Sequence, residues 1–210
     1  MDNVTVMCEG RGLKRFSVGQ SGAEPRWRIG HGPRLTDLPD EMAEWLFDAG
    51  SLTKRLRQAG EFRVELLKQQ FERPLLCERR ALGLDDRAIA LVRQVHLYCA
   101  GEIKVYARTV MPLSMLHGSS RGLARLGGRP LGEMLFRDKS MRRSPMQIAR
   151  VDEGDLFYRW GIAGIRGADV EGQIWGRRSV FRLSGQPLLV NEIFLPPLPP
   201  SRGFRIKHKV

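Results

Sequence analysis

The segment 175–197, WGRRSVFRLSGQPLLVNEIFLPP, constrains the fold of this chain more than any other stretch. Its centre, Ser184-Gly185-Gln186-Pro187, predicts a tight turn, because glycine tolerates positive φ and proline fixes its own φ. In the strand after the turn, successive side chains alternate between two faces. One face carries Leu188, Val190, Glu192 and Phe194, and the other carries Leu189, Asn191, Ile193 and Leu195. Two largely apolar faces indicate a strand that is covered on both sides.

Two charged residues interrupt otherwise apolar strand faces. Glu192 is one, and burying an unpaired carboxylate is costly enough to require a partner or a role. Arg93 is the other, and it is the only charge on a predicted strand face formed by Ile89, Leu91, Arg93, Val95, Leu97 and Cys99. The pattern fits two interpretations equally: Arg93 and Glu192 are two poles of one enclosed polar site, or they form a structural ion pair across the sheet.

The composition is that of a globular domain. A chain of 210 residues is expected to form one domain with a substantial core, and 42% hydrophobic with 28% charged residues is typical of a soluble protein. No apolar run approaches the roughly 20 residues of a membrane-spanning helix, and the N-terminus lacks the pattern of a signal peptide. The three cysteines, Cys8, Cys77 and Cys99, lack metal-ligand spacing and predict free thiols. We therefore expect a cytoplasmic protein without a membrane span.

The net charge of +12 is compatible with nucleic acid, anionic lipid or anionic substrates as partners. Part of the excess lies in residues 201–210, which contain Arg202, Arg205, Lys207 and Lys209. The rest of the chain shows neither an arginine-rich helix nor the aromatic pattern of an RNA-binding sheet. We expect a monomer with a solvated basic surface and no nucleic-acid partner.

The chain divides into three parts. Residues 1–37 predict a poorly ordered extension with at most one short element, residues 38–200 a domain, and residues 201–210 a basic tail. In the domain, capping residues and apolar spacing predict helices over 37–47, 52–59, 119–126 and 130–136. Alternation predicts strands over 62–66, 88–99, 103–111, 146–150 and the pair within 175–197. Residues 72–87 are expected to be mostly irregular, and 152–173 to form a long hairpin. Short turns between strands favour an α+β fold, an antiparallel sheet with helices packed on it.

Common catalytic motifs are missing. The sequence has no HExxH, CxxC, Walker loop, GxSxG elbow or GxGxxG after a strand. The histidines are scattered, and His96 falls on the strand face opposite Arg93, where we expect a structural role. An enzyme built from this chain is therefore expected to need no metal and no organic cofactor.

Several segments, in this order and spacing, resemble one known family. They are GSLTKRLRQAG at 50–60, LVRQVHLYCAGE at 91–102, ARTVMPLSMLHG at 107–118, LGGRPLGEMLF at 126–136, and WGRRS with RLSGQPLLVNEIFLP in 175–197. From about Leu38 to Pro197 the chain is similar to the chorismate lyases, the chorismate pyruvate-lyases of ubiquinone biosynthesis.

The resemblance implies a six-stranded antiparallel sheet and an enclosed ligand site beneath helical flaps. It also implies cleavage of chorismate to 4-hydroxybenzoate and pyruvate without a cofactor. By position, Arg93 would bind the ring carboxylate and Glu192 would meet the ring hydroxyl, which makes both candidates for catalysis. The backbone amide of Leu131 would also bind the carboxylate, and Leu52 would be a further contact. The family often has methionine at position 52, and such a swap preserves volume.

Arg108, in the stretch that resembles the family's RTV-P segment, is a further basic candidate. Its direction is open, because it shares a strand face with Tyr106 and Val110. Two other functions remain possible for such a domain: a non-catalytic effector-binding module like those of bacterial transcription regulators, or an inactive relative that only binds aromatic acids. No helix-turn-helix pattern precedes the domain, which favours the enzyme.

Overall fold

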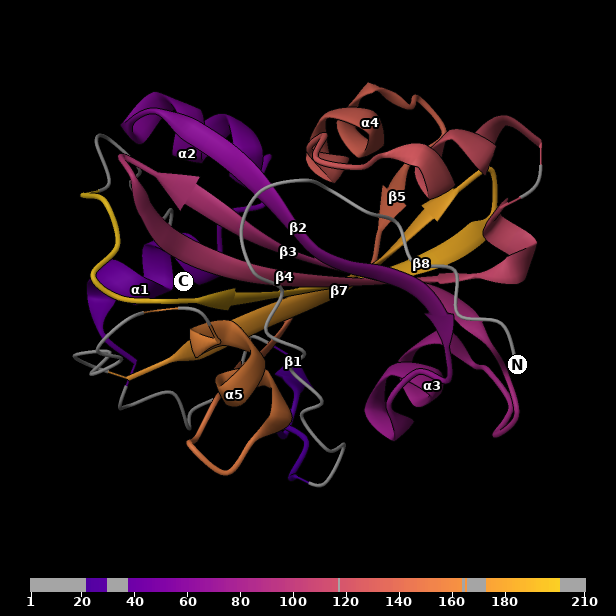
Figure 1. The fold of residues 1–210 in the computed structure, drawn as a ribbon, viewed down its shortest axis with the longest axis horizontal. Coiled ribbons are helices and arrows are strands. Elements are labelled where there is room, and N and C mark those ends of the chain that lie inside the picture. The colour runs from indigo at the N-terminus through magenta and orange to yellow at the C-terminus, as the bar shows by residue number, and fades with distance from the viewer. Residues whose placement is uncertain (1–21, 30–37, 117, 164, 166–172, 201–210) are drawn as a thin grey trace, which may run out of the picture.

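The structure is a computed structural model that describes residues 22–29, 38–116, 118–163, 165 and 173–200 (Figure 1). The strands are β1 Arg28–Ile29, β2 Phe62–Glu72, β3 Ala90–Cys99, β4 Glu102–Pro112, β5 Arg142–Arg143, β6 Gln147–Arg150, β7 Trp175–Leu183 and β8 Gln186–Phe194. The α-helices are α1 Asp40–Leu46, α2 Leu52–Ala59, α3 Leu76–Leu82, α4 Leu131–Arg137 and α5 Leu156–Ile162, and two 3-10 helices cover Leu113–Leu116 and Gly118–Arg125. In the part of the chain that the structure describes, no helix is long and apolar enough to cross a membrane.

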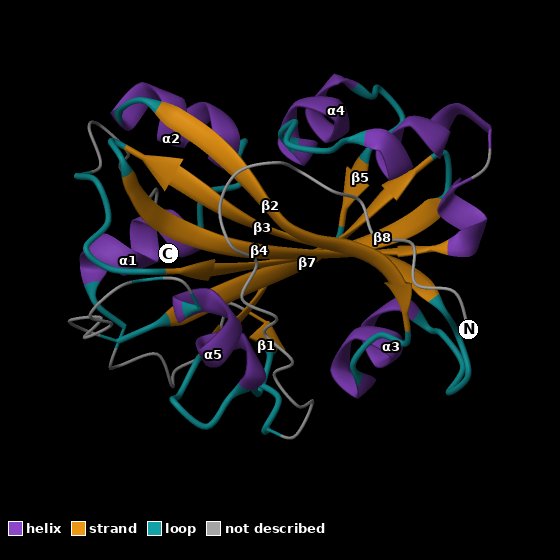
Figure 2. Ribbon diagram, viewed as in Figure 1, coloured by secondary structure: helices purple, strands orange, loops and turns teal. Residues whose placement is uncertain are grey.

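The strands form one antiparallel sheet in the order β1-β6-β7-β8-β4-β3-β2, with β5 also pairing with β7 (Figure 2). The predicted α+β fold with an antiparallel sheet is therefore confirmed. The resemblance implies six strands, and the described residues form eight, because β1 and β5, of two residues each, add short pairings beside β6 and β7.

Both predicted hairpins are present and turn in the same way. Ala100 and Gly101 join β3 to β4 with φ of 52° and 83°, and Ser184 and Gly185 join β7 to β8 with φ of 47° and 83°. Two successive residues with positive φ match the right-handed twist of the strands on either side, which is why such loops close tight hairpins. The second hairpin sets the register of the whole 175–194 segment.

Helices cover both faces of the sheet. In Figure 1, α2 and α4 lie on one side of the sheet, and α3 and α5 lie on the other. Leu188 and Val190 of β8 pack with the buried leucines of α4, whereas Leu189 packs with α3 and Ile193 with α5. The two apolar faces predicted for this strand are thus both buried, each under its own layer of helices.

Two segments differ from the sequence prediction. The stretch 72–87, expected to be mostly irregular, contains the end of β2 and the helix α3. The carboxylate of Glu78 accepts the backbone N–H of Leu75 at 3.0 Å and caps the first turn, and Gly83 ends the helix with φ of 66°. A capping interaction from within the helix is a weak signal in sequence, and the nearby Pro74 and Gly83 masked it.

The stretch 152–173, expected to be a hairpin, begins with the helix α5, and residues 164 and 166–172 lie outside the described residues. Phe157 is fully buried against the edge of Trp27, with ring centroids 5.9 Å apart, so tertiary packing decides the helix. The helix predicted over 119–126 is a 3-10 helix.

The predicted extension contains one described element, β1, as the expectation of at most one short element allowed. Residues 1–21 and 30–37 of the extension and the tail 201–210 lie outside the described residues. Of the expected free thiols, Cys77 and Cys99 are free and Cys8 is not among the described residues.

Candidate active site

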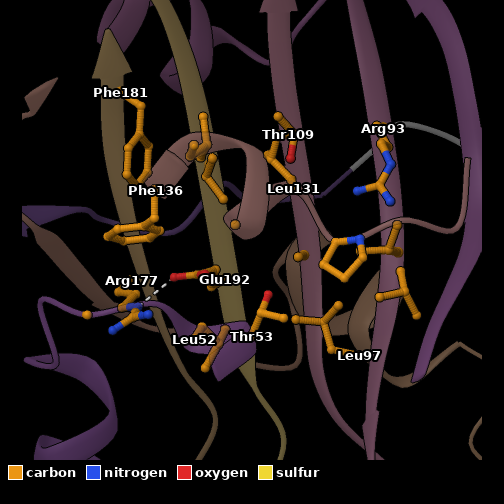
Figure 3. A pocket seen from close by; sticks show the side chains of 18 of the residues that line it. Leu52, Thr53, Arg93, Leu97, Thr109, Leu131, Phe136, Arg177, Phe181 and Glu192 are labelled. Carbon is orange, nitrogen blue, oxygen red and sulfur yellow. Dashed lines mark hydrogen bonds and ion pairs between the residues drawn. The ribbon is translucent and has the colours of Figure 1, made fainter. Parts of the chain in front are cut away.

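A pocket, part of which opens toward solvent, lies between the sheet and the two helices α2 and α4 (Figure 3). Its floor is the face of the sheet that carries Arg93, Thr109, Val190 and Glu192, on the adjacent strands β3, β4 and β8. A largely apolar pocket with a few polar groups is typical of a small-molecule site. The pocket therefore unites the two strand faces whose isolated charges the sequence analysis selected.

Arg93 is a buried cation without a counterion. Its side chain is 2% exposed, and one terminal nitrogen donates to the carbonyl oxygens of Gly127 and Arg129 at 2.8 and 3.0 Å. Its Nε has no hydrogen-bond partner, and among the described residues no carboxylate lies within ion-pair distance. Burial lowers the pKa of Arg93 to about 10, so the guanidinium is charged at neutral pH. A buried cation without a counterion lowers stability, and an anion bound beside it would offset that cost.

Glu192 has a cation of its own. Its Oε2 accepts from Nε of Arg177 at 2.5 Å, and no described group donates to its Oε1. Arg177 is 1% exposed and is held by the carbonyl oxygens of Trp45 and Asp48 at 2.8 and 2.7 Å. Arg93 and Glu192 thus do not form the ion pair that was one of the two interpretations. They line one pocket as separate charged groups (Figure 3).

Arg177 was missed by sequence reasoning, although a signal for it existed. A two-residue loop at Ser184 and Gly185 pairs Leu183 with Gln186, and counting back along the hairpin places Arg177 directly opposite Glu192. Side chains opposite each other in an antiparallel pair lie on the same face of the sheet. The sequence analysis placed the turn over Ser184–Pro187, a register two residues away, so its prediction did not by itself identify this ion pair.

Leu52 and Leu131, the two uncharged candidates, both line the pocket. Leu52 is the first residue of α2, which Ser51 caps by accepting the N–H of Lys54 at 3.4 Å. Leu131 is the first residue of α4, after Pro130, and no side chain caps this helix. Amides in a first turn have no partner within their own helix, which leaves the Leu131 N–H as a donor of the kind the resemblance implies.

Arg108, the remaining candidate, lies on the opposite face of the sheet and does not line the pocket. It is 1% exposed, forms hydrogen bonds of 2.8 and 3.1 Å to Glu78, and pairs with Glu72 at 3.1 Å. Burial alone would lower the pKa of Arg108, but the charge and hydrogen bonds of Glu78 raise it above its ordinary value. The structure therefore assigns Arg108 to a buried ionic network beneath the sheet.

His96 lies on that same far face, where its Nε2 is 3.2 Å from the carbonyl oxygen of Gly161. Burial lowers its pKa. This geometry agrees with the structural role that the sequence analysis expected.

A third arginine, Arg143 of β5, also lines the pocket and was not selected from sequence. Its Nε donates to Oγ of Ser179 at 3.0 Å, and a terminal nitrogen donates to the carbonyl oxygen of Ala49 at 3.1 Å. Burial lowers the pKa of Arg143, and the charge of Arg177 lowers it further. Among the described lining residues, three arginines stand against one glutamate, a formal surplus of two positive charges.

Fold and pocket together define a class of protein: an α+β domain with a pocket between a sheet and two helices, whose lining carries a formal surplus of two positive charges. The apolar lining suits a ring, and the cations at its sides suit carboxylates.

The comparison with known families identifies the chain more closely. The family model for chorismate lyase matches residues 31–201, so the chain belongs to the chorismate lyase family. It is 44% identical over 181 residues to the probable chorismate pyruvate-lyase of Thiobacillus denitrificans, covering 85% of this chain and 93% of that protein. It is 41% identical over 157 residues to the protein of the same name from Methylococcus capsulatus, covering 74% and 94%. The resemblance found in the sequence is confirmed.

Solved structures show the fold in another setting. The chain matches PhnF from Mycobacterium smegmatis with a TM-score of 0.53 and 14% identity, over 78% of this chain and 71% of that one. It matches the ligand-binding domain of a putative GntR-family transcriptional regulator from Bordetella bronchiseptica with a TM-score of 0.51 and 16% identity, over 70% and 92%. At these identities the likeness concerns the fold alone.

Proposed function

We propose that this protein cleaves chorismate to 4-hydroxybenzoate and pyruvate, the first committed step of ubiquinone biosynthesis, as a cytoplasmic monomer without a nucleic-acid partner. The observation that carries the proposal is the pocket in which the buried, counterion-free Arg93 faces the Glu192–Arg177 pair. Membership of the chorismate lyase family supports the reaction.

The charges predict how the substrate lies. Strands β3 and β8 are separated by β4, so at about 4.8 Å per strand their backbones are about 10 Å apart. That spacing leaves room for a six-membered ring between the side chains of Arg93 and Glu192. In this pose Arg93 and the amide of Leu131 bind the ring carboxylate, Glu192 meets the ring hydroxyl, and Leu52 contacts the ring.

The chemistry follows from this pose. The ring carbon that carries the hydroxyl loses its proton, and the electron pair of that C–H bond completes the aromatic ring. The neighbouring C–O bond breaks and its electron pair leaves with enolpyruvate, which takes up a proton to become pyruvate. Glu192, whose Oε1 has no described donor, receives the ring proton or orients the hydroxyl. Arg177 holds this carboxylate in place, which limits the reorganisation needed during reaction.

The test is an assay of the purified protein with chorismate and no added metal. Pyruvate is followed through lactate dehydrogenase, and 4-hydroxybenzoate is measured by chromatography. Equal amounts of both products support the lyase. Because the pocket is largely buried, we expect release of the aromatic product to limit turnover, with a burst in the first cycle.

The likeness of the fold to transcription-regulator domains supports one alternative function, a non-catalytic module that binds aromatic acids. If neither product forms while 4-hydroxybenzoate still binds, the lyase proposal fails and the domain is an aromatic-acid-binding module.

A further inference from the structure

The proposed pose accounts for only one of the two carboxylates of chorismate. Arg93 takes the ring carboxylate, and Glu192 takes the hydroxyl at the opposite end of the ring. The second carboxylate belongs to the enolpyruvyl group, whose ether oxygen sits on the ring carbon next to the hydroxyl-bearing carbon. It must therefore lie on the Glu192 side of the pocket, away from Arg93.

Two cations occupy that side. The strands follow one another in the order β3, β4, β8, β7, and β5 pairs with β7 beyond β8, so Arg177 and Arg143 both lie on the far side of Glu192 from Arg93. In Figure 3, Arg177 and Arg93 stand at opposite sides of the pocket. Arg143 is close enough to feel the charges of both Arg177 and Glu192.

These two arginines differ in what they already bind. Arg177 is committed to Glu192 and to two backbone carbonyls. Arg143 binds one hydroxyl and one carbonyl, and among the described residues no carboxylate lies within ion-pair distance of it. A partly buried arginine beside a second arginine, without a carboxylate of its own, has the character of an anion site.

We propose that Arg143, supported by the charge of Arg177, binds the enolpyruvyl carboxylate of chorismate. This inference rests on the proposed function and adds a recognition site for the leaving group. Arg143 and Arg93 then hold the substrate at its two ends, which orients the C–O bond that breaks. The formal surplus of two positive charges in the pocket matches the two carboxylates of the substrate.

The proposal makes Arg143 selective for substrate over product, because 4-hydroxybenzoate lacks the enolpyruvyl group. In the Arg143→Gln variant, kcat/KM for chorismate should fall about 10- to 100-fold, the range expected for the loss of one charge-assisted hydrogen bond. The dissociation constant of 4-hydroxybenzoate should stay within about twofold of wild type, since a group that makes no contact contributes little. Arg143→Lys should recover part of the loss.

Arg142→Gln is the matched control. Arg142 is the exposed neighbour on the same two-residue strand, and among the described residues its side chain donates to the backbone carbonyls of Lys139 and Met141. Its variant should leave both measurements unchanged. An unaltered kcat/KM in Arg143→Gln, or an equal weakening of chorismate and 4-hydroxybenzoate, would overturn the assignment.

The wild-type assay separates this inference from the proposed function. If wild type forms no pyruvate, the lyase proposal fails, and chorismate and 4-hydroxybenzoate are compared as ligands by calorimetry. A selective loss of chorismate binding in Arg143→Gln would still support the second carboxylate site, and equal binding in variant and wild type would refute it.

Discussion

Replacing Arg93 by methionine should weaken ligand binding strongly while changing the stability of the unliganded protein little, so the two roles of Arg93 can be measured separately. Methionine fills a similar volume without a charge. In the wild type, burial lowers the pKa of Arg93 to about 10. At about 1.4 kcal/mol per pKa unit, this corresponds to a destabilisation of roughly 3 kcal/mol at neutral pH, where the folded state must hold a desolvated cation. The penalty begins to fall only as the pH rises above the lowered pKa, where the folded state loses the proton before the unfolded state does.

The substitution also has a cost. The carbonyl oxygens of Gly127 and Arg129 lose their donor, at about 1–2 kcal/mol each. Gain and cost nearly cancel, so the free energy of unfolding without ligand should change by only about 1 kcal/mol. Binding has no such compensation. Loss of a buried, charge-assisted pair with the ring carboxylate should weaken the binding of 4-hydroxybenzoate by about 3 kcal/mol, which raises its Kd more than 100-fold.

Calorimetry and thermal unfolding with and without 4-hydroxybenzoate measure both quantities. At a ligand concentration of 100 times the wild-type Kd, binding stabilises the wild type by about 2.7 kcal/mol, and a variant with a 100-fold higher Kd by only about 0.4 kcal/mol. Two results would refute the reasoning: an unchanged Kd, or an unliganded variant several kcal/mol less stable than wild type. The second would make Arg93 a structural residue.

Three further predictions address the other charged groups. Glu192→Gln should lower kcat about 10²- to 10⁴-fold while the chain still folds, because glutamine keeps an oxygen acceptor for Arg177, whereas the exposed Glu102→Gln should leave kcat unchanged; an unaffected rate would remove Glu192 from the chemistry. Arg108→Met should cost about 3–5 kcal/mol of stability, because it leaves the buried carboxylate of Glu78 without its cation, with little change in Kd for 4-hydroxybenzoate; a stable variant with weakened binding would return Arg108 to the site. His96 has a folded pKa below its unfolded value of 6.5, so the unfolded state binds the proton more tightly and stability should fall as the pH drops below about 6.5. Denaturant unfolding at several pH values between about 7 and 5.5 measures this effect. The free energy of unfolding should depend less on pH in His96→Gln than in wild type, and an equal pH dependence would contradict the lowered pKa of His96.

Local patterns sufficed for the strands and for the hairpins. The alternation at 188–195 predicted a strand with two buried faces, and helices cover both. The same patterns failed at α3 and α5, which are short and contain weak or interrupted signals. In α5, burial of Phe157 against Trp27 stabilises the helix, and no property of the local sequence predicts that contact.

The candidate site shows the same division. Arg93 and Glu192 attracted attention as charges in apolar rows, and both line the pocket. Arg108 has a similar position in an apolar strand, yet it lies on the other face and pairs with Glu78. Alternation assigns side chains to one of two faces, but it does not say which face a ligand occupies.

The sequence by itself determined the family, the antiparallel sheet and the two strands that carry opposite charges into a buried face, because these follow from side-chain type and period along the chain. Only the tertiary structure decided which charges meet. Glu192 pairs with Arg177 across a hairpin, whereas Arg93 is left with backbone carbonyls and Arg143 reaches the pocket from the short strand β5. The physical reason is that an ion pair depends on the distance between side chains in space, which strand order and register set, and Arg143 is brought to Glu192 by pairings between distant parts of the chain.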